Sequence, residues 1–244
     1  MEVLEWQERS VLLLGKDRIE KLSKSHVLVV GLGGVGAYAA ENLCRAGVGR
    51  MTIADGDVVM PSNINRQLPA YHSSIGRNKT EMMAERLIDI NPLLQLNIVN
   101  EYLTPDGMRD LLSSRPFDYV ADAIDTLSPK IYLIYETIKR NIPLVSSMGA
   151  GGRMDPSLVQ ISDISQSYNC RLAYNIRKRL RRLGVTTGFK VIFSPETADR
   201  NSVLHLEGET NKKSTVGTIS YMPPLYGCYL ASVIVRDLAD GRLY

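Results

Sequence analysis

The stretch of sequence that decides the fold is Val27-Leu28-Val29-Val30-Gly31-Leu32-Gly33-Gly34-Val35-Gly36, in which an apolar run leads into a glycine turn. An alanine-rich helix pattern follows. Gly31 allows a strand to turn tightly into a helix, Gly33 lets a phosphate approach the backbone, and Gly36 lets helix and strand pack closely. Phosphates at such a turn meet the free N–H groups and the dipole of a helix N-terminus. The stretch therefore predicts a nucleotide-binding strand, turn and helix.

Strand and helix patterns alternate on both sides of this turn. A helical segment is expected at 9–22, with helices at 34–45, 78–90, 105–112 and 130–140, and strands at 27–30, 51–54, 96–99, 119–125 and 143–147. This alternation predicts an α/β fold, a Rossmann-like, doubly wound and mainly parallel sheet with helices on both faces. Further strands are expected at 159–161 and 190–194, a long mobile loop at 196–217, and a core helix at 225–235.

The chain has 244 residues, enough for one large domain with a buried core. We expect a single domain over 1–244, with an N-terminal helical arm at 1–25, a nucleotide-binding core at 26–150, and a substrate-facing part at 151–244. The net charge of +3 does not by itself indicate a nucleic-acid partner. The N-terminus is acidic where a secretory signal is basic, and the apolar stretch at 225–235 is too short to cross a bilayer. No membrane partner and a cytoplasmic location are therefore expected.

The cysteines are Cys44, Cys170 and Cys228, far apart and without any Cys-x-x-Cys pair. This spacing supports neither a zinc ribbon nor a disulfide framework, and it fits a reducing compartment. Cys44 and Cys228 lie in helix patterns and are expected in the core. Cys170 precedes Arg171, a cation that favours the thiolate, so a covalent role for it is the less favoured alternative to no role.

The loops after the predicted strands carry charged groups suited to a nucleotide. Asp55 ends the second strand, at the spacing at which a carboxylate meets a ribose hydroxyl. Arg66 and Lys79 suit phosphate oxygens, and Asp125, after a later strand, suits Mg²⁺ bridging a triphosphate. Solvation of Lys79 and a capping role for Asp125 are the simpler readings of each residue alone. Their shared position at one sheet edge favours an ATP site made by Gly31, Gly33, Gly34, Gly36, Asp55, Asn63, Arg66, Lys79 and Asp125.

This set of residues resembles the signature of the ubiquitin-activating-type superfamily, which includes the bacterial activators of sulfur carriers. The resemblance implies ATP and Mg²⁺ as cofactors, attack of a carboxylate on the α-phosphate, and release of pyrophosphate. It implies Arg66, Lys79 and Asp125 as catalytic residues, with Asp125 as the metal ligand. It also implies a homodimer, in which Arg9 of one protomer reaches the ATP site of the other.

A strongly basic run without any acid occupies residues 171–182. On a helix, Leu172, Ile176 and Leu180 (or Leu183) would form one apolar stripe, and basic residues would cover the rest. Clustered cations are the electrostatic footprint of nucleic-acid binding, although a solvated surface helix is the alternative. The candidate nucleic-acid contacts are Arg171, Arg177, Lys178, Arg179, Arg181 and Arg182.

The chain as a whole is similar to the family of dehydratases that act on threonylcarbamoyladenosine in tRNA. The similarity covers Asn91-Pro92, Asp122-Ala123-Ile124-Asp125, Gly149-Ala150-Gly151-Gly152 and Asp155-Pro156, besides the basic run. It implies tRNA as the partner, adenylation of the threonine carboxylate, and attack by the modification's own carbamoyl group to form a ring. It leaves open a bound monovalent cation and a sulfur-transfer protein as further partners.

Three other functions remain open at this point. The first is adenylation of the C-terminus of a ubiquitin-like or sulfur-carrier protein, although the Cys-x-x-Cys pairs common among those activators are missing. The second is an NAD-dependent oxidoreductase, although no hydride-transfer acid such as Tyr-x-x-x-Lys is evident. The third is a non-catalytic tRNA- or protein-binding scaffold with a relic nucleotide site.

Overall fold

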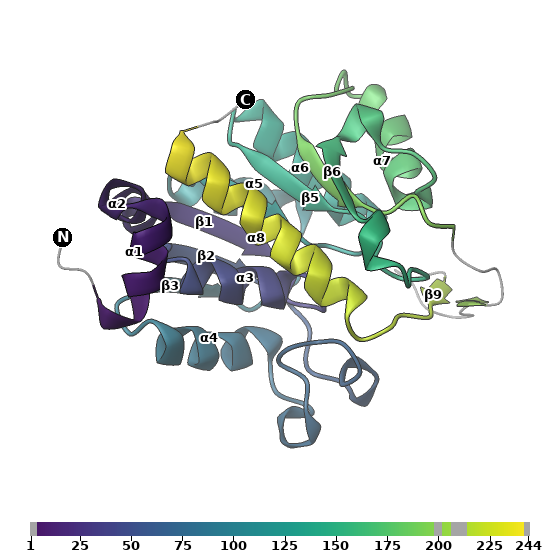
Figure 1. Cartoon of the computed structure of the whole chain (residues 1–244). Helices are drawn as coiled ribbons and strands as arrows, with labels where there is room; N and C mark the ends of the chain where they lie inside the picture. Colours follow the sequence, from purple (N-terminus) through teal and green to yellow (C-terminus); the bar gives the residue numbers. More distant parts are fainter. Residues whose placement is uncertain (1–3, 198–201, 206–213, 242–244) are drawn as a thin grey trace.

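The computed structural model describes residues 4–197, 202–205 and 214–241. Its centre is a seven-stranded sheet with the order β3-β2-β1-β4-β5-β7-β6 (Figure 1). The strands are β1 (His26–Val30), β2 (Arg50–Ala54), β3 (Gln95–Val99), β4 (Tyr119–Asp122), β5 (Leu144–Ser147), β6 (Gln160–Asp163) and β7 (Lys190–Phe193). The pairs from β3 through β7 are parallel, and β6 joins β7 antiparallel. The predicted α/β fold class is confirmed.

Helices cover both faces of this sheet, as the sequence predicted. They are α1 (Glu8–Leu14), α2 (Lys16–Lys24), α3 (Gly36–Arg45), α4 (Lys79–Ile90), α5 (Pro105–Ser114), α6 (Leu127–Lys139), α7 (Arg171–Arg181) and α8 (Met222–Asp240). The short 3₁₀ segments are η1 (Glu5–Gln7), η2 (Pro61–Asn63), η3 (His72–Ser74), η4 (Pro156–Leu158) and η5 (Ile164–Gln166). Within the described ranges, no helix is both long and apolar enough to cross a bilayer.

The side chains of β1 alternate between two hydrophobic cores, because successive strand residues point to opposite faces of a sheet. Val27 and Val29 pack with residues of α2, α3, α4 and α8. Leu28 and Val30 pack with residues of α5, α6 and α7. Figure 1 shows α8, in yellow, lying across one face beside α3. Both faces of the central strand are therefore buried, which explains why its sequence is an uninterrupted apolar run.

Strand order reverses at β1, which lies between β2 and β4. Val30 pairs with Ala54 on one side and with Asp122 on the other, so the carboxyl ends of the three strands are level. Ligands of open α/β sheets bind outside the carboxyl ends of the strands at such a reversal. The fold therefore places its natural binding crevice at the residues that follow Val30, Ala54 and Asp122.

A buried ion pair shapes the loop that leaves β4. Asp122 and Lys130 are both fully buried, and the Lys130 ammonium lies 2.8 Å from the Asp122 carboxylate. The carboxylate also accepts hydrogen bonds from the Ser146 hydroxyl (2.6 Å) and the Ile124 N–H (3.1 Å), and Lys130 donates to the Ile124 carbonyl (2.9 Å). Two buried charges are tolerated when each is paired and hydrogen-bonded. The network fixes the backbone immediately before Asp125.

The structure corrects two boundaries and one loop. The strand predicted at 119–125 ends at Asp122, because the Asp122 side chain accepts from the backbone two residues on and turns the chain. The helix predicted from residue 130 begins at Leu127. The loop predicted at 196–217 contains two short antiparallel strands, β8 (Val203–His205) and β9 (Ser214–Val216). Residues 198–201 and 206–213 of that prediction lie outside the described residues.

Candidate active site

The glycine turn between β1 and α3 is held at the carboxyl edge of the sheet by close backbone contacts. Gly31 has a positive φ of 90°, and a Cβ there would lie 2.8 Å from the Ala123 carbonyl oxygen. A Cβ on Gly36 would lie 1.7 Å from the Gly31 carbonyl oxygen. No side chain caps the start of α3, and of its first N–H groups that of Ala37 donates to the Gly33 carbonyl (3.3 Å), so an anion bound here would meet an end that no side chain occupies. The turn thus has the form of a phosphate cradle.

Asp55 stabilises this turn from the end of β2. Its carboxylate accepts hydrogen bonds from the N–H of Leu32 (2.5 Å) and from the N–H of Asp57 (2.8 Å). Burial raises the pKa of Asp55, while the nearby Lys79 ammonium and the two N–H donors oppose the increase. The structure therefore brings Asp55 to the turn. Its contact with a ribose hydroxyl stays a prediction.

Lys79 is the first residue of α4 and is 4% exposed, so the simple reading of a solvated surface lysine is wrong. Its ammonium donates to the Asp57 carboxylate at 2.6 Å. Tyr102 donates to the same carboxylate, and this hydrogen bond raises the pKa of Tyr102 to about 12. Asp57 is a partner that the sequence analysis did not identify. The predicted contact of Lys79 with phosphates is untested by this arrangement.

The loop that carries Arg66 lies directly against the glycine turn. A Cβ on Gly34 would lie 3.2 Å from the Arg66 carbonyl oxygen, and one on Gly33 would lie 3.7 Å from the side-chain nitrogen of Gln67. The Arg66 guanidinium donates to the Asn65 side chain (2.7 Å) and to the carbonyl of Ser62 (2.8 Å). Hydrogen bonds within this loop therefore fix the position of the Arg66 side chain.

Two amides complete the loop. Asn63 accepts from the N–H of Met60 at 3.0 Å, which closes the turn that begins the loop. The side-chain oxygen of Gln67 is buried and has no hydrogen-bond partner within the described residues. A buried acceptor without a donor is costly, and a bound molecule beside Gly33 could supply the donor. The polar groups beside the turn thus suit a nucleotide.

Asp125 follows the β4 loop and is exposed at this same edge, two residues after Ala123 contacts Gly31. Mg²⁺ bound with a nucleotide usually keeps several waters and takes only one or two protein carboxylates. Within the described ranges no cluster of three or more His, Cys, Asp or Glu side chains could hold a metal. The donors present therefore fit a nucleotide-bound Mg²⁺ held by Asp125 better than an ion held by protein groups alone.

Helix α7 confirms the helical form of the basic run. Ala173, Ile176 and Leu180 are buried in the core. The predicted stripe is confirmed, because Leu172 packs against the same core, half-buried, and Leu180 rather than the exposed Leu183 continues it; Ala173 is an addition to the stripe. The predicted contacts Arg171, Lys178, Arg179, Arg181 and Arg182 are exposed, whereas Arg177 is half-buried and donates to Ser167.

The basic helix lies close to the candidate site. The Arg179 guanidinium donates to the Ser128 hydroxyl at 3.2 Å, and Ser128 comes three residues after Asp125. The exposed cations of α7 thus begin beside the edge that carries the nucleotide-binding groups. The sequence alone did not show this proximity.

Arg9 is exposed on α1 and lies away from the turn of its own chain. Gln7, just before α1, packs against Gly47, in the turn that precedes β2. That turn lies at the amino ends of the strands, and a five-residue strand spans about 17 Å. One protomer therefore cannot combine its own Arg9 with its own glycine turn.

Two of the cysteines, Cys44 and Cys170, are buried, which does not suit a nucleophile. Cys170 is 5% exposed at the start of α7, and Cys44 is fully buried, where burial raises its pKa to about 11. Cys228 is exposed, so its predicted core position is wrong. It lies on the outer side of α8, next to Gly227, which packs against Val35. A buried thiol suits packing rather than attack on a large substrate.

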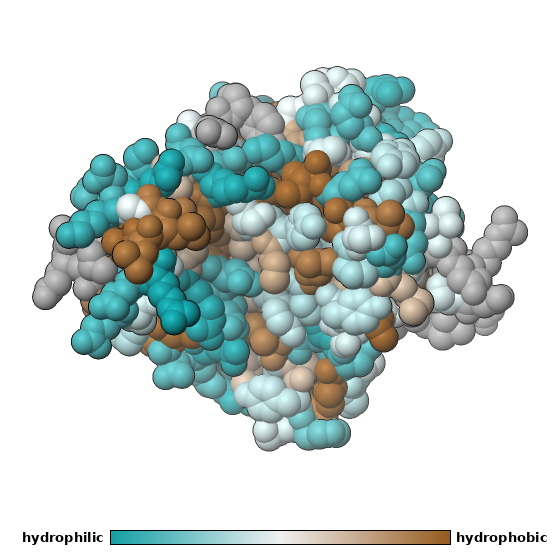
Figure 2. Space-filling model, viewed as in Figure 1, coloured by the Kyte–Doolittle hydropathy of each residue, from teal (hydrophilic) through white to brown (hydrophobic). Residues whose placement is uncertain are grey.

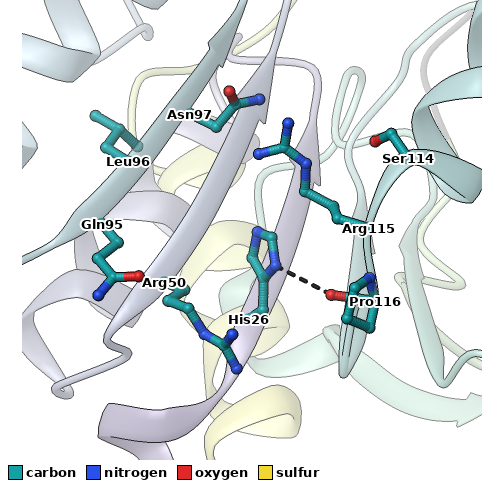
Figure 3. Close-up of a pocket in the computed structure, with 8 residues that line it drawn as sticks. All are labelled: His26, Arg50, Gln95, Leu96, Asn97, Ser114, Arg115 and Pro116. Atoms are coloured by element: carbon teal, nitrogen blue, oxygen red, sulfur yellow. Dashed lines mark hydrogen bonds between the residues drawn. The ribbon is translucent and has the colours of Figure 1, made fainter.

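A second depression, of about 430 Å³, lies at the opposite edge of the sheet (Figure 3). His26 contacts the Pro116 carbonyl (3.1 Å) and the Thr52 hydroxyl (2.9 Å) through its two ring nitrogens. Both nitrogens are thus occupied by the protein, and burial lowers the pKa of His26. Because this depression lies at the amino ends of the strands, it is separate from the candidate active site.

Comparison with known proteins agrees with this geometry. A model of the ThiF family matches residues 7–240, so the chain belongs to the ThiF family. The chain is 38% identical to a tRNA threonylcarbamoyladenosine dehydratase of Bacillus subtilis over 94% of its own length and 93% of that protein. The resemblance inferred from the sequence is confirmed.

Solved structures extend the comparison. The fold matches that of E. coli tRNA N6-threonylcarbamoyladenosine dehydratase in complex with ATP, with a TM-score of 0.88 and 31% identity, over 99% of this chain and 98% of that one. The same enzyme is also known in complex with AMP. A sulfur carrier protein ThiS adenylyltransferase of Escherichia coli is 35% identical, but over only 60% of this chain and 59% of that protein.

The glycine contacts predict a clear difference between two matched substitutions. Gly36→Ala should lower the free energy of unfolding by about 1–3 kcal/mol, because the new Cβ would collide with the Gly31 backbone. Gly149→Ala adds the same methyl group where no atom lies within 4 Å. This variant should change the free energy of unfolding by less than about 0.5 kcal/mol. Denaturant unfolding of the purified variants measures both. Equal stabilities would contradict the proposed packing of the turn.

Proposed function

We propose that this protein is an ATP-dependent dehydratase of threonylcarbamoyladenosine in tRNA, acting in the cytoplasm. The observation that carries the proposal is the similarity to dehydratases over nearly the full length of both chains, including α7 and α8. The candidate site supports it, because the glycine turn, the Arg66 loop and Asp125 meet at one edge of the sheet.

The proposed reaction has two steps. An oxygen of the threonine carboxylate attacks the α-phosphorus of ATP, which forms an acyl-adenylate and releases pyrophosphate. The carbamoyl group of the same modification then attacks the acyl carbon, a ring closes, and AMP leaves. The modification loses one water overall, and ATP becomes AMP and pyrophosphate. No enzyme thiol takes part, in agreement with the burial of Cys170.

The cations around the turn would act on the first step. Charge gathers on the phosphate oxygens as the carboxylate attacks, and fixed positive groups stabilise it at that moment. Arg66 and Lys79 are already held in position by Asn65 and Asp57. Mg²⁺, held by Asp125, would neutralise charge on the triphosphate.

We assign tRNA contact to the exposed face of α7. The helix carries no acidic residue, and its cations begin next to Ser128 at the active edge. Arginine and lysine side chains bind the phosphate backbone without reading sequence, so this face would orient tRNA and leave recognition of the modified nucleoside to the site.

We also propose a homodimer built around α1. Leu12 and Leu13 are 87% and 81% exposed on the helix that carries Arg9, and Figure 2 shows the apolar patch over that helix. Exposed apolar patches of this kind are typical of protein contacts. A partner that covers the patch would bring Arg9 within reach of a second glycine turn, which its own protomer cannot offer.

Adenylation of a sulfur-carrier protein is the second candidate, because a sulfur-carrier adenylyltransferase is 35% identical over 60% of this chain. It predicts pyrophosphate exchange that depends on a carrier with a Gly-Gly tail and is indifferent to tRNA.

The decisive assay incubates the protein with Mg-ATP and tRNA that bears threonylcarbamoyladenosine. Nucleoside mass spectrometry should show the loss of one water from the modification. Arg66→Ala and Asp125→Ala should each slow the conversion by roughly 10²-fold or more, because each removes stabilisation of the transition-state charge. Folded protein that binds ATP and leaves the nucleoside mass unchanged would overturn the proposal. If both variants convert the nucleoside as fast as wild-type protein, the catalytic roles proposed for Arg66 and Asp125 are wrong.

Removing charge from α7 should weaken tRNA binding in a salt-dependent way. A double variant that combines Lys178→Ala with Arg182→Ala removes two positive charges from this region. It should reduce the slope of log affinity against log salt by about 1.5. Filter binding over a salt series measures the slope. The matched control is Arg115→Ala with Lys139→Ala, two exposed cations away from the active edge. Equal slopes for the two double variants would exclude α7 as the tRNA surface.

The α1 patch should control the oligomeric state. Leu12→Asp with Leu13→Asp should convert the dimer into a monomer and abolish activity, because charges replace the apolar contact. Leu183→Asp, at an exposed leucine beyond α7, should leave the dimer intact. Arg9→Ala should lower activity without changing the mass. Light scattering reports the mass, and a monomeric wild-type protein under assay conditions would contradict the model.

A further inference from the structure

Arg153 is a buried cation whose hydrogen-bonding capacity is only partly used within the described part of the chain. Its side chain comes at the end of the glycine-rich loop that follows β5, and the residue is 7% exposed. The guanidinium nitrogens Nε and Nη1 are both buried and have no hydrogen-bond partner there. A buried guanidinium with unused donors is unfavourable, so its position favours binding of an acceptor that the described residues do not supply.

The polar groups nearest in space do not meet this need. The Glu196 carboxylate accepts instead from the backbone N–H groups of Met154 (2.9 Å) and Asp155 (3.0 Å). The hydroxyl of Tyr226 lies close enough to Arg153 for the guanidinium to lower its pKa through charge and hydrogen bonding, against the larger effect of burial, but it makes no hydrogen bond of regular geometry within the described residues. Arg153 and Tyr226 thus form a small buried polar cluster with unpartnered groups on both members.

The cluster is connected to the nucleotide edge on one side. A Cβ on Gly151 would lie 3.1 Å from the Thr218 hydroxyl, and the Thr218 carbonyl accepts from the Asn65 side chain at 3.0 Å. Asn65 in turn accepts from Arg66. A short chain of contacts therefore joins the loop of Arg153 to the loop that holds the expected phosphate-binding arginine.

The same cluster is connected to the basic helix on its other side. The Tyr226 hydroxyl is also within electrostatic range of Cys170, the residue directly before α7. Arg153 is thus linked to the edge where ATP is expected, through its own loop, and to the start of the helix where tRNA is expected, through Tyr226.

We propose that Arg153 binds the carboxylate that is adenylated, as the carboxylate-binding subsite of the reaction. This inference rests on the proposed function. A planar guanidinium binds a carboxylate through two parallel hydrogen bonds, and such a pair fixes orientation as well as position. In the proposed site the phosphates of ATP would have other partners, namely the start of α3, Arg66, and Mg²⁺ held by Asp125. Arg153 is a binding and positioning group that would hold one carboxylate oxygen toward the α-phosphorus.

The test compares two tRNAs that differ in this carboxylate. Wild-type protein with α,β-methylene-ATP, which cannot release pyrophosphate, should bind tRNA bearing threonylcarbamoyladenosine more tightly than the same tRNA unmodified. Arg153→Ala should lose that preference, on the order of 100-fold, and bind both tRNAs as wild type binds the unmodified one. Arg153→Lys should keep part of the preference, because the charge remains and the two-point geometry is lost.

Two controls separate binding from folding. Arg115→Ala removes an exposed arginine at the opposite edge and should leave the preference unchanged. Arg153→Met should not lower the melting temperature of the ligand-free protein, because it removes a buried charge two of whose donors have no hydrogen-bond partner within the described residues. ATP affinity should be unchanged in every Arg153 variant.

Different results overturn different proposals. If wild-type protein converts the modified nucleoside and Arg153→Ala keeps its preference for modified tRNA, the carboxylate subsite lies elsewhere. Weakened ATP binding would assign Arg153 to the phosphates, and a lower melting temperature for Arg153→Met would make it a structural residue. If wild-type protein fails to convert the nucleoside, the proposed function itself fails.

Discussion

The structure depends on one close approach of backbone to backbone, between the glycine turn and the start of α3. A side chain at Gly36 would lie 1.7 Å from the Gly31 carbonyl oxygen, and one at Gly31 would meet the backbone of Ala123. Only glycine permits this packing, since any Cβ would push α3 away from β1. The contact sets the position of the first N–H groups of α3, and hence of any phosphate that they bind.

The approach also brings distant segments to one edge. Because strand order reverses at β1, the loop after β2 and the loop after β4 lie on either side of the turn. Helix α8, formed by the end of the chain, closes over it: a Cβ on Gly34 would lie 2.8 Å from Pro223, and one on Gly227 would lie 2.5 Å from the Val35 carbonyl oxygen. The C-terminal region is therefore part of the site and not an appendage to it.

The charged side chains at this edge differ in whether the protein provides them with ion-pair or hydrogen-bond partners. Lys79 is paired with Asp57, Arg66 is held by Asn65, and Lys130 is paired with Asp122. The spacing of Lys79 and Arg66 in the sequence identifies them but not their partners, since such pairs depend on where loops lie in space. Arg153 could not be identified from the sequence, because a single arginine after a glycine-rich loop matches no motif. Only burial without a partner distinguishes it.

The sequence by itself determined the fold class, the position of the glycine turn and the identity of the basic helix, because these follow from local periodicity and from the steric freedom of glycine. It did not determine where β4 ends, the hairpin of β8 and β9, or the exposure of Cys228. Tertiary structure decided those, together with the closeness of α7 to Asp125 and the burial of Arg153. Each depends on contacts between residues far apart in the chain. A local sequence pattern does not predict the free energy of such contacts.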